Sequence, residues 1–436
     1  MNFAVMDQLL KGKRILLAHV PLEGHFNPLT GLAKFLQEMG CDVRWYTSAI
    51  FAGKLDKLGI RYYPFVKALE LNGQNLWQMV PGLKDGTASE KGRLYLKNLF
   101  IDRSVEYFED IAAIYQEFKF DLLIADSMFS AMPLVRYKLH VPVLAIGIVP
   151  LIEDSVDVAP YGRALPPAHD QETRDAYAQM YVQKYTGIKD LIEHYRELLS
   201  TYRVQVKGSF VFDTLVKEAN MYLQIGVPGF EYPRSDMGDN IRFIGALLPY
   251  SAPSQRKAWF DERLKQYKKI VLVTQGTVEQ DVTKLLIPTL QAFTGTDTLV
   301  VATTGGNSTA ELRQKYAADN IIIEDFIPFD DVMPYASVYV TNGGYGGTLL
   351  SIKHNLPIVA AGVHEGKSEI CARIDYFKCG INLKTETPTT EAIYAATETI
   401  INDGVYKNSI TALNKEMDGY HALDLCRQYI NELLLA

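Results

Sequence analysis

Short apolar runs alternate with amphipathic helical patterns along most of this chain. The run "RILLAHV" (14–20) predicts a buried strand, "PLTGLAKFLQEMG" (28–40) has apolar residues at helical spacing, and "DVRWYTS" (42–48) predicts another strand. Strands that alternate with helices in this way favour a parallel sheet with helices on both faces. We therefore expect an α/β, doubly wound fold.

The same alternation begins again after residue 257, which indicates a second domain of the same kind. The chain has 436 residues, more than one hydrophobic core usually supports. Between the two patterns, "GALLPYSAPSQRK" (245–257) contains two prolines and little periodicity. We predict a first domain over residues 1–244, a linker over 245–257, a second domain over 258–420 and a last helix over 421–436.

Charge and composition narrow the class of protein. The formal net charge is −7 and there is no basic tract, so nucleic acid is not an expected partner. The four cysteines lack the C-x-x-C spacing of zinc sites, so we expect no metal and reduced thiols. No run reaches the ~20 apolar residues of a membrane span. We expect a cytoplasmic protein without a transmembrane segment, either a monomer or a weak homodimer.

A burst of glycines follows one of the predicted strands of the second domain. In "YVTNGGYGGTLLS" (339–351), Gly343, Gly344, Gly346 and Gly347 stand where a strand leads into a helix. A helix N-terminus offers free N–H groups to an anion, and glycine lets the backbone approach it. The spacing matches neither G-x-G-x-x-G nor a P-loop. The burst indicates a phosphate-type ligand; a tight turn that binds nothing is the alternative.

Two other strands of this domain end in small residues. "VLVTQGTVEQ" continues past its strand with Gly276 and Thr277, and "VVATTGGN" ends with Gly305 and Gly306. Because the carboxyl ends of parallel strands meet at one edge of a sheet, the three loops together predict a ligand-binding crevice.

One histidine and one aspartate follow strands of the first domain. His25, in "EGHFNP", lies in the predicted turn between the first strand and the helix opened by Pro28, and Asp126 ends the strand "DLLIAD". An aspartate that accepts one imidazole N–H fixes the tautomer and stabilises the imidazolium. The pair predicts a general base, although a capping or solvent-facing histidine is the alternative. We expect His19, inside the strand run, to be a packed core residue.

These segments together resemble the family 1 glycosyltransferases of GT-B fold, which use nucleotide sugars. "GHFNPLTGLAKFL" and "IADSMF" look like the segments that carry the catalytic base and its aspartate. "FIPFDDVMPYASVYVTNGGYGGTLLSIKHNLPIV" and "EGKSEICARIDYFKCGINL" look like the donor box. The resemblance spans nearly the whole chain. It implies two Rossmann-like doubly wound domains that face each other across a cleft, with the helix at 421–436 crossing back to the first.

The resemblance also implies roles for single residues. His25 is the base and Asp126 its partner, Phe326 stacks on the nucleobase near the Ile327 backbone, and Thr277 reaches the diphosphate. Further donor contacts are Gly276, Asn342, Gly343, Gly344, Gly346, Gly347 and Thr348 at the diphosphate, and Glu365, Gly366 and Lys367 at the transferred sugar. The reaction inverts the anomeric configuration and needs no cofactor and no metal; the partners are a nucleotide sugar and a small acceptor.

The donor box departs from the family pattern at four places. Asn342 replaces the usual histidine, Phe329 a glutamine, and Leu350 and Ser351 stand near the place of a glutamate that holds the ribose. The usual Asp-Gln pair is Gly366-Lys367. Both a UDP-sugar such as UDP-glucose and a dTDP-deoxysugar such as dTDP-rhamnose therefore stay open as the donor.

The acceptor pocket is expected in the two segments of weak pattern, 66–100 and 150–185. The expected acceptor contacts are aromatic or apolar, namely Phe26, Trp77, Met128, Phe129 and Tyr161. Such residues suit a flat or lipophilic alcohol, for example a flavonoid. For each aromatic residue, a place in the core is the alternative. A GT-B-fold sugar-nucleotide epimerase and a non-catalytic sugar-nucleotide-binding protein are the alternative functions.

Overall fold

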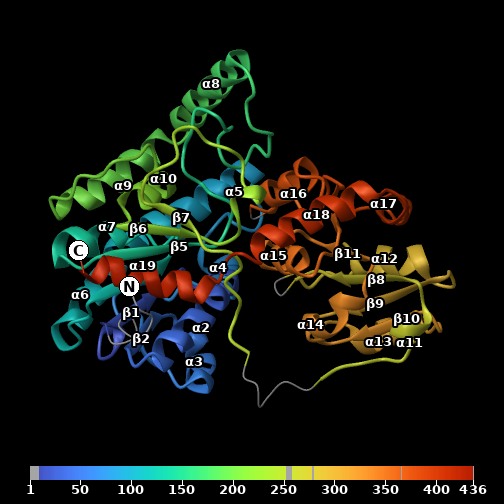
Figure 1. Cartoon of the computed structure of the whole chain (residues 1–436). Coiled ribbons are helices and arrows are strands. Elements are labelled where there is room, and N and C mark those ends of the chain that lie inside the picture. The colour runs from blue at the N-terminus through green and yellow to red at the C-terminus, as the bar shows by residue number, and fades with distance from the viewer. Residues whose placement is uncertain (1–8, 252–257, 277–278, 365, 436) are drawn as a thin grey trace.

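A computed structural model of the chain describes residues 9–251, 258–276, 279–364 and 366–435, and it contains two parallel sheets (Figure 1). The first sheet has seven strands: β1 Arg14–Ala18, β2 Asp42–Thr47, β3 Arg61–Pro64, β4 Leu122–Asp126, β5 Val143–Gly147, β6 Met221–Gln224 and β7 Ile241–Phe243. Its helices are α2 Glu23–Glu38, α3 Ala52–Leu58, α4 Leu76–Met79, α5 Ala88–Tyr95, α6 Arg103–Glu117, α7 Met132–Leu134, α8 Gln171–Gly187, α9 Lys189–Thr201 and α10 Val211–Glu218.

The second sheet lies in the C-terminal half of the chain. It has six strands: β8 Lys269–Thr274, β9 Thr298–Thr303, β10 Ile321–Glu324, β11 Val338–Thr341, β12 Ile358–Ala360 and β13 Gly380–Asn382. Its helices are α11 Arg263–Gln266, α12 Leu286–Phe293, α13 Thr309–Lys315, α14 Phe329–Val332, α15 Tyr345–Lys353, α16 Lys367–Tyr376, α17 Thr390–Asn402 and α18 Gly404–Met417. A last helix, α19, spans Ala422–Leu435. The predicted α/β class with two doubly wound units is confirmed.

Strand order brings the loops of interest together. The orders are β3-β2-β1-β4-β5-β6-β7 and β10-β9-β8-β11-β12-β13. In the first sheet β1 lies beside β4, with Ala18 opposite Ala125, and in the second β8 lies beside β11, with Thr274 opposite Thr341. The loop after each of these strands therefore starts beside the loop of its neighbour, at the edge where open α/β sheets bind ligands.

Both faces of the first sheet are covered by apolar cores, as the unbroken apolar runs predicted. Along β4, Leu122 and Ile124 belong to one core, and Leu123 and Ala125 belong to the core on the opposite face. Successive side chains of a strand point to opposite faces, so a strand that is buried on both sides has no polar alternation.

Several local expectations differ from the structure. Helix α2 begins at Glu23, five residues before the expected start, so Pro28 lies inside it and His25 is in its first turn rather than in the preceding turn. Three short strands, β3, β6 and β7, had no clear sequence pattern. The weak segment 66–100 holds α4, α5 and most of a π-helical stretch over Leu96–Ile101.

Helix α19 returns to the first half of the molecule. Figure 1 shows it as the red helix beside β6 and α2, and its Cys426 and Ile430 belong to the same apolar core as Leu29 of α2. This core also contains Leu349 of α15 and Ile374 of α16, so apolar packing continues between the halves. The domain boundaries at 244, 257 and 420 stay predictions, and part of the expected linker, 252–257, lies outside the described residues.

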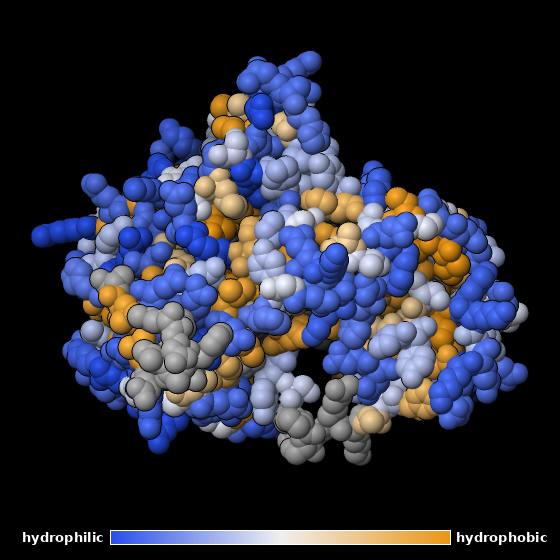
Figure 2. All heavy atoms as spheres, in the orientation of Figure 1, coloured by the Kyte–Doolittle hydropathy of each residue, from blue (hydrophilic) through white to orange (hydrophobic). Residues whose placement is uncertain are grey.

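The remaining global expectations concern thiols and membranes. The four cysteines are buried and none forms a disulfide. Among the helices that the structure describes, none combines the length and the apolar character that crossing a bilayer would require. On the face shown in Figure 2 most residues are hydrophilic, and hydrophobic residues lie in smaller groups near the middle and on both halves.

Candidate active site

His25 and Asp126 form a hydrogen bond at the carboxyl edge of the first sheet. The distance between His25 Nδ1 and Asp126 Oδ1 is 2.9 Å, and the two side chains are 11% and 0% exposed. The first turn of α2 follows β1, and Asp126 is the last residue of the neighbouring β4, so the parallel pairing of these strands brings them together. Since a carboxylate accepts, Nδ1 carries the proton and Nε2 is the nitrogen that can take another.

The buried carboxylate of Asp126 has backbone partners as well. Oδ2 accepts the N–H of Val20 at 2.7 Å, and Oδ1 accepts the N–H of Met128 at 2.8 Å. Three donors on one carboxylate compensate for the loss of water around its charge. They also fix its orientation, and with it the tautomer and direction of the His25 ring.

His19 shows what a structural histidine looks like in the same region. It is fully buried, Trp45 donates its indole N–H to Nδ1 at 2.8 Å, and Phe26 and Phe51 pack against the ring. Burial lowers the pKa of His19 well below its ordinary value, and the nearby His25 lowers it further. His19 is therefore a neutral core residue, as the sequence predicted, while His25 has an acidic partner and a side chain that is 11% exposed.

The glycine-rich loop lies between β11 and the first turn of α15, and the surroundings of its glycines differ. Gly343 has φ +79°, and a Cβ there would come within 2.4 Å of Cys371 Sγ, so packing alone requires glycine. A Cβ on Gly347 would lie 3.1 Å from the Tyr339 hydroxyl. Gly346 is exposed and a Cβ there would meet open space. Packing within the protein therefore does not require glycine at position 346.

Gly346 and Thr348 lie inside the first turn of α15, which begins at Tyr345. Thr348 is fully buried and donates its hydroxyl to the Gly344 carbonyl at 3.0 Å. The amide of Asn342 donates to the Gln275 carbonyl and so joins the loop after β11 to the loop after β8, where Gly276 has φ +79°. Asn342 and Thr348 are thus engaged within the protein, whereas the first N–H groups of a helix such as α15 have no partner inside the helix and can bind an anion.

Phe326 lies just past the carboxyl end of β10 with 73% of its surface exposed, whereas the adjacent Ile327 is buried among the apolar residues of the second sheet. An exposed aromatic ring at the ligand-binding edge of a sheet is free to stack on a flat group. Thr277 and Glu365 lie outside the described residues.

Gly366 precedes α16 with φ +77°, and it lies against Tyr161 of the first half. A Cβ at position 366 would come within 2.9 Å of the Tyr161 hydroxyl. Tyr161 therefore contacts the loop expected at the transferred sugar. Lys367 is the first residue of α16.

The other expected acceptor contacts divide into core and surface residues. Phe26 is 1% exposed and stacks on Phe51, and Phe129 is 0% exposed and stacks on Tyr107. Both belong to the packed interior, so their positions do not support the expected acceptor role. Trp77, which is 46% exposed, and the half-buried Met128 remain accessible.

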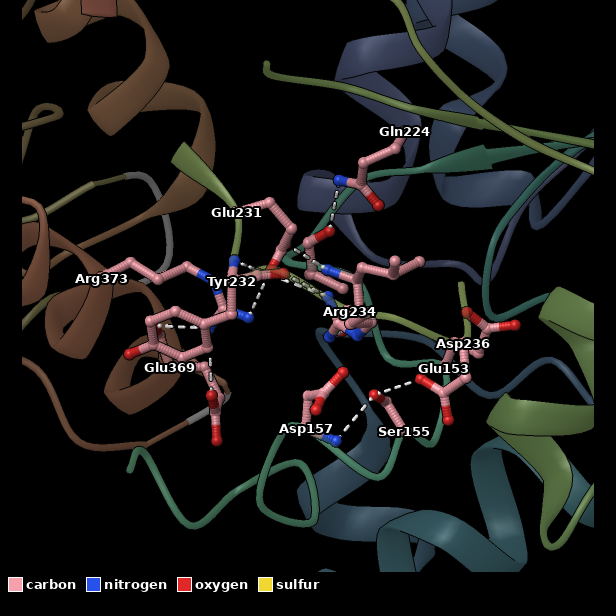
Figure 3. A network of polar contacts seen from close by, with 12 residues as sticks. Glu153, Ser155, Asp157, Gln224, Glu231, Tyr232, Arg234, Asp236, Glu369 and Arg373 are labelled. Atoms are coloured by element: carbon pink, nitrogen blue, oxygen red, sulfur yellow. Dashed lines mark hydrogen bonds and ion pairs between the residues drawn. The ribbon is translucent and has the colours of Figure 1, made fainter. Parts of the chain in front are cut away.

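A buried ionic network between the halves was missed by sequence reasoning (Figure 3). Arg373 of α16 donates to Glu231 at 2.5 and 3.0 Å and to Glu369 at 3.1 Å, and Arg234 contacts Glu231 at 3.3 Å. The Glu369–Arg373 spacing of four residues was the available signal, but such pairs usually lie on exposed helix faces. Among the described residues, no group of three His, Cys, Asp or Glu side chains is placed to hold a metal ion.

Comparisons with known proteins find similar chains over nearly the whole length of this one. Residues 288–421 match the family described as "Erythromycin biosynthesis protein CIII-like, C-terminal domain". The 4'-demethylrebeccamycin synthase of Lentzea aerocolonigenes is 31% identical, over 93% of this chain and 96% of that protein. UDP-glycosyltransferase 2 of Phaeomoniella chlamydospora is 29% identical, over 97% and 96%. Among solved structures, the glycotransferase of kitacinnamycin superposes with a TM-score of 0.75 at 17% identity, over 97% of this chain and 100% of that one.

Proposed function

The chain belongs to the family 1 glycosyltransferases of GT-B fold, and we propose that it is an inverting hexosyltransferase whose base is His25. The proposed reaction moves a hexose from a UDP- or dTDP-sugar to a hydroxyl of a small aromatic or lipophilic acceptor. The observation that carries the proposal is the buried hydrogen bond from His25 to Asp126 at the sheet edge.

His25 acts on the acceptor. Nε2 takes the hydroxyl proton while the acceptor oxygen attacks the anomeric carbon from the face opposite the nucleotide. The bond from that carbon to the diphosphate oxygen breaks, the electron pair leaves with the diphosphate, and the configuration inverts. Asp126 stabilises the imidazolium that forms, and general-base assistance of this kind contributes ~10²–10⁴-fold to the rate.

The diphosphate meets the N-terminal turn of α15. Its free N–H groups and the positive end of the helix dipole stabilise the charge that develops on the leaving group. Gly346 faces open space there, so the backbone can be approached closely. Phe326 stacks on the nucleobase, and Gly276, Gly366 and Lys367 line the rest of the donor site.

The donor and the acceptor are proposed more broadly. The name UDP-glycosyltransferase 2 of the relative from Phaeomoniella chlamydospora indicates a UDP-sugar donor for that protein, which makes a UDP-sugar such as UDP-glucose the first donor to test. A dTDP-deoxysugar such as dTDP-rhamnose stays the second candidate, because Leu350 and Ser351 leave the ribose position without a carboxylate. Trp77 and Met128 offer apolar contacts that suit a flavonoid-type phenol.

The test is a transfer screen by mass spectrometry with UDP-glucose, UDP-galactose and dTDP-rhamnose against a panel of phenols and aliphatic alcohols. We expect a product whose mass exceeds that of the acceptor by one hexosyl or deoxyhexosyl unit, with an inverted anomeric centre by NMR. An epimerised donor in the absence of acceptor would favour the epimerase alternative. Donor binding by calorimetry without transfer to any acceptor would contradict the proposed chemistry.

A further inference from the structure

Glu369 connects the helix of the expected sugar loop to the first half of the molecule. It lies in the first turn of α16, three residues after Gly366, and its side chain is 7% exposed. Its Oε2 accepts from Arg373 of the same helix, which Figure 3 labels nearby, and its Oε1 accepts from the long loop between β5 and α8. A buried carboxylate at this place requires an explanation, since burial of a charge is costly unless it is satisfied.

One oxygen of Glu369 is used entirely by that loop. Oε1 accepts the N–H of Gly162 at 2.7 Å and the N–H of Ala164 at 2.8 Å. Gly162 has φ +97° and Ala164 has φ +53°, a left-handed conformation that is uncommon for alanine. Two N–H groups that converge on one anionic oxygen stabilise this turn, so the carboxylate holds the loop in a shape that its own sequence does not favour.

A second contact joins the same segment to Gly366, the residue just before α16. The Tyr161 hydroxyl lies 2.9 Å from the position that a Cβ on Gly366 would take, is buried, and has no hydrogen-bond partner among the described residues. The segment 161–164 is thus placed against both Gly366 and Glu369, at the end of α16 that the proposed function assigns to the transferred sugar.

The two halves are joined by other contacts besides those of Glu369. Arg373 already donates twice to Glu231, which belongs to the first half and also contacts Arg234. Another carboxylate, Glu416 of α18, joins the halves elsewhere by accepting the N–H of Gly229 at 3.1 Å. The distinct contribution of Glu369 is the pair of hydrogen bonds that holds the turn at Gly162 and Ala164.

We propose that Glu369 is a positioning residue, which fixes the loop segment 161–164 against the start of α16. This segment contains the expected acceptor contact Tyr161, and Gly366 before α16 belongs to the loop proposed at the transferred sugar. Glu369 keeps the two in one relative position during transfer. This inference rests on the proposed function. It assigns to Glu369 no contact with either substrate. Without the carboxylate, the segment 161–164 is no longer held in one conformation. Productive acceptor binding then decreases, because Tyr161 is poorly placed, while the donor site on the second sheet is unchanged.

The experiment compares Glu369→Ala, Glu369→Gln and the matched control Glu416→Ala. Glu369→Ala is expected to raise the acceptor KM at least about tenfold and to leave the UDP dissociation constant within about twofold. Glu369→Gln keeps an oxygen that can accept the N–H groups of Gly162 and Ala164, although it places an amide NH2 beside Arg373. Its acceptor KM should therefore lie much closer to the wild-type value than that of Glu369→Ala. Glu416→Ala removes an interdomain hydrogen bond of the same kind and should leave the acceptor KM unchanged.

Hydrogen exchange of the substrate-free protein gives a readout that does not depend on catalysis. The amides of Gly162 and Ala164 should exchange at least about tenfold faster in Glu369→Ala than in wild type, and should be unaffected in Glu416→Ala. Unchanged exchange, or equal effects of the two alanine variants on acceptor KM, would overturn the positioning role. If wild type transferred no sugar at all, the proposed function would fail, whereas the exchange result would still decide whether Glu369 holds the loop.

Discussion

Replacing Arg373 with methionine tests whether the buried network stabilises the protein as its geometry indicates. The Arg373 side chain is 2% exposed and pairs with Glu231, which is 4% exposed, and with Glu369, which is 7% exposed. Removing one member of a buried ion pair typically costs ~3–5 kcal/mol, because the other charge is left buried. Since Arg234 still contacts Glu231, we expect a loss in the lower part of this range, about 3 kcal/mol at pH 7.5.

The pH dependence of that loss gives the sharper test. In wild type, burial acts to raise the pKa of Glu231, but the Arg373 and Arg234 guanidinium groups outweigh it, so the pKa lies below its ordinary value. A lowered carboxyl pKa contributes stability that is present above the unfolded-state pKa of ~4.3 and is lost as the pH falls through the folded-state value. Without Arg373, burial is the larger influence on the Glu231 pKa, so Glu231 of the folded variant takes up a proton at a pH above the unfolded-state pKa. Its deficit relative to wild type should therefore shrink from pH 7.5 to pH 5.5.

Urea unfolding followed by tryptophan fluorescence measures both effects. The control is Arg93→Met, because Arg93 pairs with Asp190 at 2.6 Å but the two side chains are 37% and 65% exposed. This exposed pair should contribute only ~0–1 kcal/mol. A cost below 1 kcal/mol for Arg373→Met, or a deficit equal at both pH values, would refute the assignment of a buried, charge-compensated network.

Three further substitutions test the site itself. His25→Ala should lower transfer at least ~100-fold and leave UDP binding by calorimetry intact; equal loss of both would contradict the role of base. Gly346→Val should abolish donor binding without lowering the unfolding midpoint, because a Cβ at this position lies in open space; unchanged affinity would remove the phosphate site from this turn. Gly343→Ala should instead destabilise the fold by ~1–3 kcal/mol, because its Cβ overlaps Cys371 Sγ; an unchanged melting temperature would show that the packing relaxes.

The parts of the fold that follow from local pattern could be predicted from the sequence. Unbroken apolar runs specify strands buried on both faces, and the rule that parallel strands end at one edge was enough to bring His25 to Asp126 across 101 positions. The start of α2 was placed too late because Gly24, Asn27 and Pro28 are weak helix formers. Tertiary packing of Phe26 and Leu29 overrides that preference.

Contacts between distant segments could not be predicted in the same way. Glu231 and Arg373 are 142 positions apart, and nothing near either residue marks the other as its partner. The four glycines were read as having one common cause, but Gly343 is required by Cys371 from α16, a neighbour that only the folded chain supplies. The same limit applies to Phe26, which adjoins His25 in sequence but points into the core.

The return of α19 to the first sheet has a practical consequence for building chimeras of related enzymes. Cys426 and Ile430 complete the apolar core that α2 lines, although they follow the whole second sheet in the chain. A chimera that replaces everything after the linker would seat a foreign helix in that core. A graft that ends after α18 and retains the native α19 keeps Cys426 and Ile430 packed against their native neighbours in the core of the first half.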